Sequence, residues 1–108
     1  MQITANPAHQ TVLTTFDVTP GTCQDLMDEL RAAYADFIRH QPGFVGAALH
    51  VNDAQTRIAN YSQWRQRADF QAMLRTDEMR ARNRRINALC RSFEPVMIDV
   101  MAVFAPEV

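Results

Sequence analysis

The stretch "RIANYSQW", residues Arg57 to Trp64, is the segment on which the predicted fold depends. Side chains alternate between the two faces of a β-strand, so Ile58, Asn60 and Trp64 share one face. A carboxamide among apolar groups needs a hydrogen bond, because burying it without a partner costs about 1–3 kcal/mol. The sequence therefore predicts that Asn60 meets either another protein group or a ligand.

A second strand precedes this one and predicts a hairpin. Residues 44–51 form another β-like run, and Asn52 and Asp53, both good turn formers, stand between the two runs. We expect residues 44–51 and 57–64 to pair as antiparallel neighbours.

The N-terminal third predicts a strand followed by a helix. Residues 10–18 are rich in β-branched and aromatic types, as strands are. Thr22 and Asp25 have the spacing of a helix-capping pair, so the helix is expected to begin near Cys23. Its apolar side chains recur at helical spacing: Leu26, Leu30, Ala33 and Phe37.

Two further helices and a last strand are predicted after Trp64. A short helix carries Phe70, Met73 and Leu74, and Thr76 is suited to cap the next helix. The mostly apolar stripe of that second helix consists of Met79, Asn83, Ile86 and Cys90. Asn83 is the one amide in it. From Pro95 onward, the run "VMIDVMAVF" predicts the fourth strand.

The element order β-α-β-β-α-β predicts an α+β fold, a ferredoxin-like plait whose four-stranded antiparallel sheet carries the helices on one face. We expect one domain over residues 1–108, with its core at about 11–104. The strands at 44–51 and after Pro95 are apolar on both parities, which favours a second sheet over the open face. The simplest arrangement is a homodimer, a dimeric α+β barrel.

Composition narrows the partners without naming one. The formal net charge of -1 gives no general attraction to nucleic acid or to a membrane, and no stretch is long enough to span a bilayer. Eight of the eleven arginines fall in residues 65–91, either as a solvated helix surface or as an anion patch. The two cysteines and three histidines have no metal-ligand spacing, so no metal is expected. Residues 1–10 lack a basic start and an apolar core, so a cytoplasmic location is expected.

The runs "QPGFVGAALH" and "ANYSQW", followed by a helix bearing Phe70 and an apolar last strand, resemble the antibiotic biosynthesis monooxygenase family of dimeric α+β barrels. The resemblance covers roughly Thr11 to Phe104. It implies a monooxygenase that needs no cofactor and uses molecular oxygen to oxidise a hydroxylated aromatic, such as an anthrone, polyketide phenol or quinol, to a quinone.

The resemblance also implies roles for particular residues. Asn60 and Trp64 occupy the positions of the motif that is implicated in catalysis in such relatives. Arg84 stands where one relative has a substrate-contacting arginine, although helical geometry places it off the apolar stripe. Phe70 stands where that relative has a tyrosine. The full set of expected substrate-binding residues, in a pocket between sheet and helices, is Tyr34, Phe37, Phe70, Asn83 and Arg84.

The sequence also bears on three other functions. A non-catalytic or cyclase-like dimer that binds an apolar aromatic ligand needs no residues beyond those already named. A heme-degrading enzyme is disfavoured, because by the expected register Asn83, Thr14 and Met73 stand where its histidine, asparagine and tryptophan would be. RNA binding is disfavoured because residues 57–64 lack the required glycine and aromatic pattern.

Overall fold

The computed structural model of the protein describes residues 2–3 and 8–107. Within them the chain forms four strands, three α-helices and one short 3₁₀ helix. In chain order these are β1 (Gln10–Asp17), α1 (Pro20–Asp36), η1 (Ile38–His40), β2 (Phe44–Val51), β3 (Arg57–Trp64), α2 (Arg67–Leu74), α3 (Asp77–Leu89) and β4 (Ser92–Ile98).

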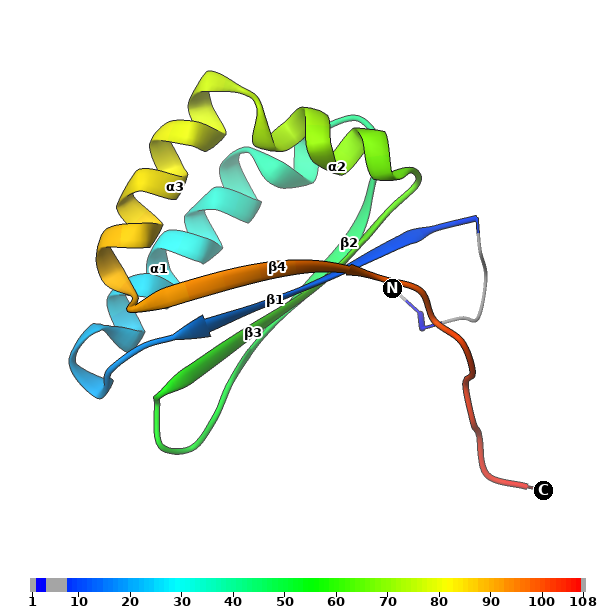
Figure 1. Ribbon diagram of the computed structural model, residues 1–108, viewed down its shortest axis with the longest axis horizontal. Helices are drawn as coiled ribbons and strands as arrows, with labels where there is room; N and C mark the ends of the chain where they lie inside the picture. Colours follow the sequence, from blue (N-terminus) through cyan, green and yellow to red (C-terminus); the bar gives the residue numbers. More distant parts are fainter. Residues whose placement is uncertain (1, 4–7, 108) are drawn as a thin grey trace.

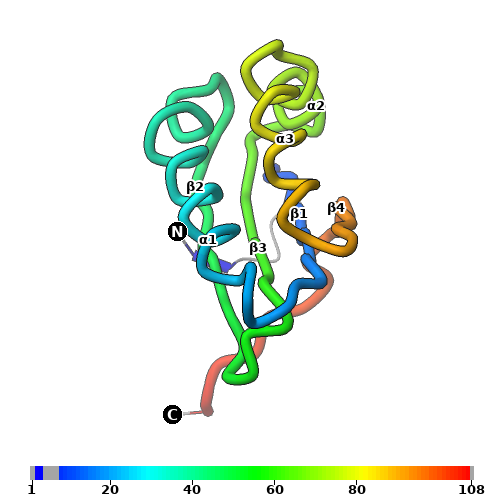
Figure 2. Tube along the Cα trace, turned by 90° about the vertical axis from the view of Figure 1, so that its left-hand side faces the viewer, coloured from blue at the N-terminus to red at the C-terminus, as the bar shows by residue number. Residues whose placement is uncertain are grey.

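The four strands form one antiparallel sheet in the order β2-β3-β1-β4. The three α-helices lie on one face of this sheet (Figure 1). The turned view shows α1 on the side of β2 and α3 on the side of β4 (Figure 2). The predicted α+β ferredoxin-like arrangement is confirmed, and so is the hairpin of 44–51 with 57–64.

The core fills the space between sheet and helices. Val12 and Phe16 of β1 and Ile58 of β3 point toward the helices, and each is at most 3% exposed. They pack against buried side chains of all three helices: Cys23, Leu26, Met27, Leu30, Ala33, Phe70, Met73, Met79 and Ile86. Burying each large apolar side chain contributes about 1.5–3 kcal/mol, so this layer is the main source of stability.

A β-bulge in β2 changes which face one aromatic ring occupies. The pairing of β2 with β3 slips between Phe44 and Gly46, so Val45 is an extra residue in the ladder. Strict alternation predicts Phe44 on the face of Ala48, and this expectation is wrong. The Phe44 ring lies on the helix-covered face, 5.3 Å from the Trp64 ring between centroids, in an edge-to-face contact.

The helix α1 begins earlier than predicted. The expected cap at Thr22 and Asp25, with a start near Cys23, is wrong, because the helix begins at Pro20 after Thr19. Proline suits the first helical position, since it has no N–H to leave unpaired there and its φ is already near the helical value.

The cap of α3 is as predicted. The Met79 backbone N–H donates to Thr76 Oγ1 at 3.2 Å, which satisfies one of the free amides of the first turn. Asp77 and Glu78 also lie in that turn, where negative charge is favoured by the helix dipole.

The last strand is displaced from its predicted position. It was expected from Pro95 onward, but β4 begins at Ser92 and ends at Ile98. Pro95 lies within β4, which is an edge strand and therefore tolerates a missing N–H. Residues 99–107 form no strand, and Met101 and Phe104 are 87% and 92% exposed.

No helix in residues 2–3 and 8–107 combines the length and the apolar character that crossing a bilayer requires.

Gly43 gives a test of the turn between η1 and β2. Its φ is +82°, and a Cβ there would overlap the Asp69 side chain. We expect Gly43→Ala to lower the free energy of unfolding by at least about 1–2 kcal/mol in urea denaturation. Gly21→Ala is the matched control, because its Cβ would meet nothing nearer than Thr19 Oγ1 at 3.8 Å. Equal stability of the two variants would contradict the strained turn.

Candidate active site

A small cavity of about 60 Å³ lies between the sheet and the helices. Its wall is mostly apolar, with a few polar groups from the strands and from α1 and α3. The lining residues are Thr14, Phe16, Leu30, Tyr34, Ile38, Asn60, Ser62, Phe70, Met73, Leu74, Met79, Asn83, Ile86, Phe93 and Pro95. Four expected site residues are therefore brought together here: Tyr34, Asn60, Phe70 and Asn83.

The Asn60 carboxamide is held by Tyr34 across the cavity wall. The Tyr34 hydroxyl donates to Asn60 Oδ1 at 2.9 Å and accepts from Asn60 Nδ2 at 2.6 Å. Asn60 is only 9% exposed, so this pairing answers the question raised by an amide on an apolar strand face. Among the residues described, no other partner engages Nδ2, which leaves its second N–H available to a ligand.

Tyr34 is the one titratable residue in the described lining of the cavity. Burial raises the pKa of its phenol above the ordinary value of about 10, and hydrogen bonds with Asn60 and Ser62 oppose that shift. The phenol is therefore protonated at neutral pH and acts as a hydrogen-bond donor to the amide.

Trp64 lies outside the lining of the cavity and supports its wall. The ring is fully buried, 5.3 Å from the Phe44 ring and 5.8 Å from the Phe70 ring between centroids. Its Nε1–H donates to Ser62 Oγ at 3.3 Å, and Ser62 lines the cavity. The predicted pair Asn60 and Trp64 thus shares one strand face, but only the amide faces the open space.

The remaining expected site residues lie outside the cavity. Phe37 packs against the core beyond the lining, at the end of α1. Arg84 is exposed on α3, where it borders a shallow outer hollow together with Arg80 and Phe93. The hollow and the cavity share Asn83 and Phe93, so Arg84 stands on the outer side of the wall that Asn83 forms.

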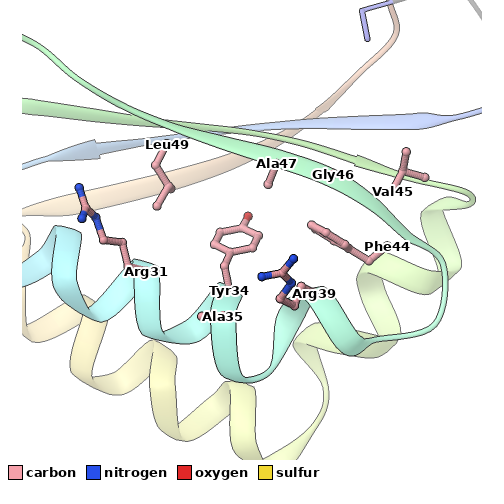
Figure 3. Close-up of a pocket in the computed structure, with 9 residues that line it drawn as sticks. All are labelled: Arg31, Tyr34, Ala35, Arg39, Phe44, Val45, Gly46, Ala47 and Leu49. Carbon is pink, nitrogen blue, oxygen red and sulfur yellow. The ribbon is translucent and has the colours of Figure 1, made fainter. Parts of the chain in front are cut away.

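A larger groove of about 560 Å³ runs between α1 and β2 (Figure 3). Tyr34 lines both the groove and the cavity, so its ring lies in the wall between them. Arg31 and Arg39 border the groove on opposite sides of the Tyr34 ring. The sequence did not predict these two arginines, because exposed arginines on a helix ordinarily face water and carry no periodic signal.

Size limits what the cavity can hold. A cavity of about 150 Å³ takes up a benzene ring, so 60 Å³ suits water or molecular oxygen but no fused ring system. In the part of the chain that the structure describes, no group of three or more His, Cys, Asp or Glu residues is arranged to hold a metal ion.

Comparison with known proteins gives the class of protein. Residues 10–85 match the family described as antibiotic biosynthesis monooxygenase. The chain belongs to the antibiotic biosynthesis monooxygenase family, as its sequence motifs predicted.

Individual relatives carry the comparison further. The tetracenomycin-F1 monooxygenase of Streptomyces glaucescens is 41% identical over 71 residues, which are 66% of this chain and 63% of that protein. The match thus spans less than two thirds of the length of this curated relative.

Two solved structures show the shared fold. The monooxygenase from the gene ActVA-Orf6 of Streptomyces coelicolor, in complex with the ligand Nanaomycin D, has a TM-score of 0.77 and 23% identity, and the match covers 93% of this chain and 94% of that one. SnoaB, a cofactor-independent oxygenase from Streptomyces nogalater, has a TM-score of 0.72 and 20% identity, with coverage of 93% and 99%.

Tyr34→Phe tests the hydrogen bonds that hold Asn60. The variant leaves a buried carboxamide without its partner, so we expect the free energy of unfolding to fall by about 1–3 kcal/mol. Chemical denaturation at neutral pH measures this loss. Tyr61→Phe is the control, since it removes the other phenol of the chain and leaves Asn60 untouched.

The pH dependence gives the same prediction a second readout. Because the pKa of Tyr34 is raised in the folded state, the unfolded chain loses this proton first as the pH rises. The stabilisation that comes from the protonated Tyr34 phenol is complete below pH about 10. It is lost as the pH rises through the folded-state pKa of Tyr34. If Tyr34→Phe lost as much stability at alkaline pH as the parent chain does, the alkaline loss would not come from Tyr34.

Proposed function

We propose that this protein is a cofactor-independent monooxygenase that oxidises a hydroxylated aromatic, an anthrone-type polyketide phenol or a quinol, to a quinone with molecular oxygen. The observation that carries the proposal is the Asn60 carboxamide, fixed by Tyr34 at the wall of a largely apolar cavity. Membership of the family and the 41% identity to a tetracenomycin-F1 monooxygenase support it.

The reaction asks little of the protein beyond favouring a substrate anion. Molecular oxygen is a triplet and reacts slowly with closed-shell organic molecules, whereas an electron-rich enolate or phenolate passes it one electron. For an anthrone, the CH₂ group and O₂ become a carbonyl and one water, by way of a hydroperoxide at that carbon. The carbon hydrogens and one oxygen atom leave as the water, so no external reductant is needed.

Asn60 has the chemistry for stabilising that anion. Its second Nδ2–H donates to the developing oxyanion, while Tyr34 keeps the amide from turning away. In other enzymes one such donor in a dry site is worth about 3–4 kcal/mol of transition-state stabilisation. Tyr34 also holds a phenolic proton beside the amide.

Trp64 takes a positioning role in this proposal. It fixes Ser62 by a hydrogen bond and Phe70 by ring contact, and both of these residues line the cavity. An indole at this place keeps the wall dry and rigid, so that the amide is presented in one orientation.

Oxygen uptake with anthrones and quinols tests the proposal. We expect Asn60→Ala to lower kcat/KM by about 100- to 1000-fold, because the donor to the oxyanion is lost. Trp64→Phe, which keeps an aromatic ring but removes the N–H, is expected to lose most turnover while remaining folded. Full turnover in both variants would reject these roles.

The control variant is Gln71→Ala, which removes an exposed carboxamide from α2. It should retain the activity of the parent chain. If the parent protein binds the aromatic compounds but consumes no oxygen with any of them, the alternative of a non-catalytic or cyclase-like binder replaces the oxygenase.

The open face of the sheet supports a homodimer as part of the proposal. Opposite the helices, one row crosses all four strands through Ala48, Tyr61, Leu13 and Val96. Val96 is 44% exposed, and the apolar residues Met101 and Phe104 follow in the exposed tail. A bare face of this kind is an association surface, and a second copy of the sheet covers it most simply.

Sedimentation at low micromolar concentration tests the homodimer. We expect a dimer for the parent chain and dissociation for Val96→Glu, because the variant places a charge in the apolar face that the second copy would cover. Val51→Glu is the control, since Val51 is 51% exposed but belongs to the helix-side parity of β2. A parent chain that sediments as a monomer would contradict the proposal.

A further inference from the structure

The aromatic body of a substrate needs a place other than the small cavity. At about 60 Å³ the cavity is well below the roughly 150 Å³ that accommodates a single benzene ring. The groove between α1 and β2 is about 560 Å³, which lies within the usual range for small-molecule sites. Tyr34 lines both spaces, so a ligand in the groove touches the residue that holds Asn60.

The groove has an aromatic and aliphatic floor with positive charge at its borders. Phe44 and Tyr34 contribute rings whose centroids are 6.0 Å apart, and Leu49 contributes an aliphatic side chain. Arg31 and Arg39 flank the Tyr34 ring (Figure 3). No carboxylate belongs to the described lining of the groove.

Arg31 and Arg39 differ from Arg82 and Arg85 of α3 in lacking ion-pair partners among the residues that the structure describes. Arg82 pairs with Glu78 at 3.2 Å, and Arg85 pairs with Glu29 of α1. Within residues 2–3 and 8–107, neither Arg31 nor Arg39 forms an ion pair. Their charge is therefore available to a ligand, and a guanidinium matches a carboxylate with two parallel hydrogen bonds.

We propose that the groove between α1 and β2 binds a fused-ring aromatic that carries an acidic substituent, with its rings on Phe44 and Tyr34 and its acid group on Arg31 or Arg39. This deepens the proposed function and rests on it, because it names the substrate class as acidic aromatics. The ligand then lies against the Tyr34 ring, whose hydroxyl is hydrogen-bonded to Asn60.

Binding of a matched pair of quinones tests the assignment without any turnover. One probe is a dihydroxyanthraquinone carboxylic acid, and the other carries a hydroxymethyl group in place of the carboxyl. Both are already oxidised, so calorimetric titration reports binding alone. We expect the acid to bind about tenfold or more tightly than the alcohol, with an advantage that shrinks as salt is added.

Arginine variants locate the acid group. Arg31→Gln, Arg39→Gln or the double variant should weaken binding of the acid about tenfold or more while leaving the alcohol unchanged. Arg75→Gln is the control, because it removes the same charge from an exposed arginine at the end of α2, away from the groove. Equal affinity for the two probes, or an equal loss in Arg75→Gln, would overturn the proposal.

Hydrogen exchange separates a ligand site from an interface between copies. Amides of β2 should exchange more slowly when the acid probe is added, at every protein concentration. If they slow with protein concentration and ignore the probe, the groove is covered by a second copy and the ligand assignment is wrong. Binding of the acid probe by a protein that consumes no oxygen would instead reject the oxygenase function and keep the site.

Discussion

The hydrogen bonds between Tyr34 and Asn60 are the constraint on which the site depends. They join α1 to a central strand of the sheet, across a space whose lining is mostly apolar. An amide that is 9% exposed would be costly without a partner, and a phenol at that depth needs one equally. The pair therefore satisfies two polar groups and fixes the direction of the amide N–H. One contact thus satisfies both buried groups and presents an oriented polar group to a mostly apolar cavity.

Much of the fold could be predicted because its pattern is local. The alternation in 57–64, the turn residues after Val51 and the cap at Thr76 each act within a few residues. The errors arose where local patterns compete. Thr22 and Asp25 have capping spacing, yet Pro20 is a better first helical residue and moves the start. Pro95 suggested a boundary, but on an edge strand its missing N–H faces no neighbour, so β4 continues through it.

The site could be predicted only in part, because its geometry is decided by contacts between distant elements. The sequence places Asn60 and Trp64 on one strand face, as it must by parity, but Trp64 is enclosed by Phe44 and Phe70 and does not face the cavity. Tyr34 was expected to bind substrate, and its pairing with Asn60 was not foreseen, since no periodicity links residues 26 positions apart. Whether the named residues act on a substrate stays a prediction.

The bulge in β2 has a consequence for how this segment can evolve. Val45 is solvent-exposed, so drift among side chains at that position is tolerated. Phe44 stands opposite Trp64 because the ladder skips Val45, so a chain that lacked Val45 would keep Phe44 opposite Trp64 in a regular ladder. A one-codon deletion at position 45 therefore leaves the pairing partners of every other residue of β2 unchanged.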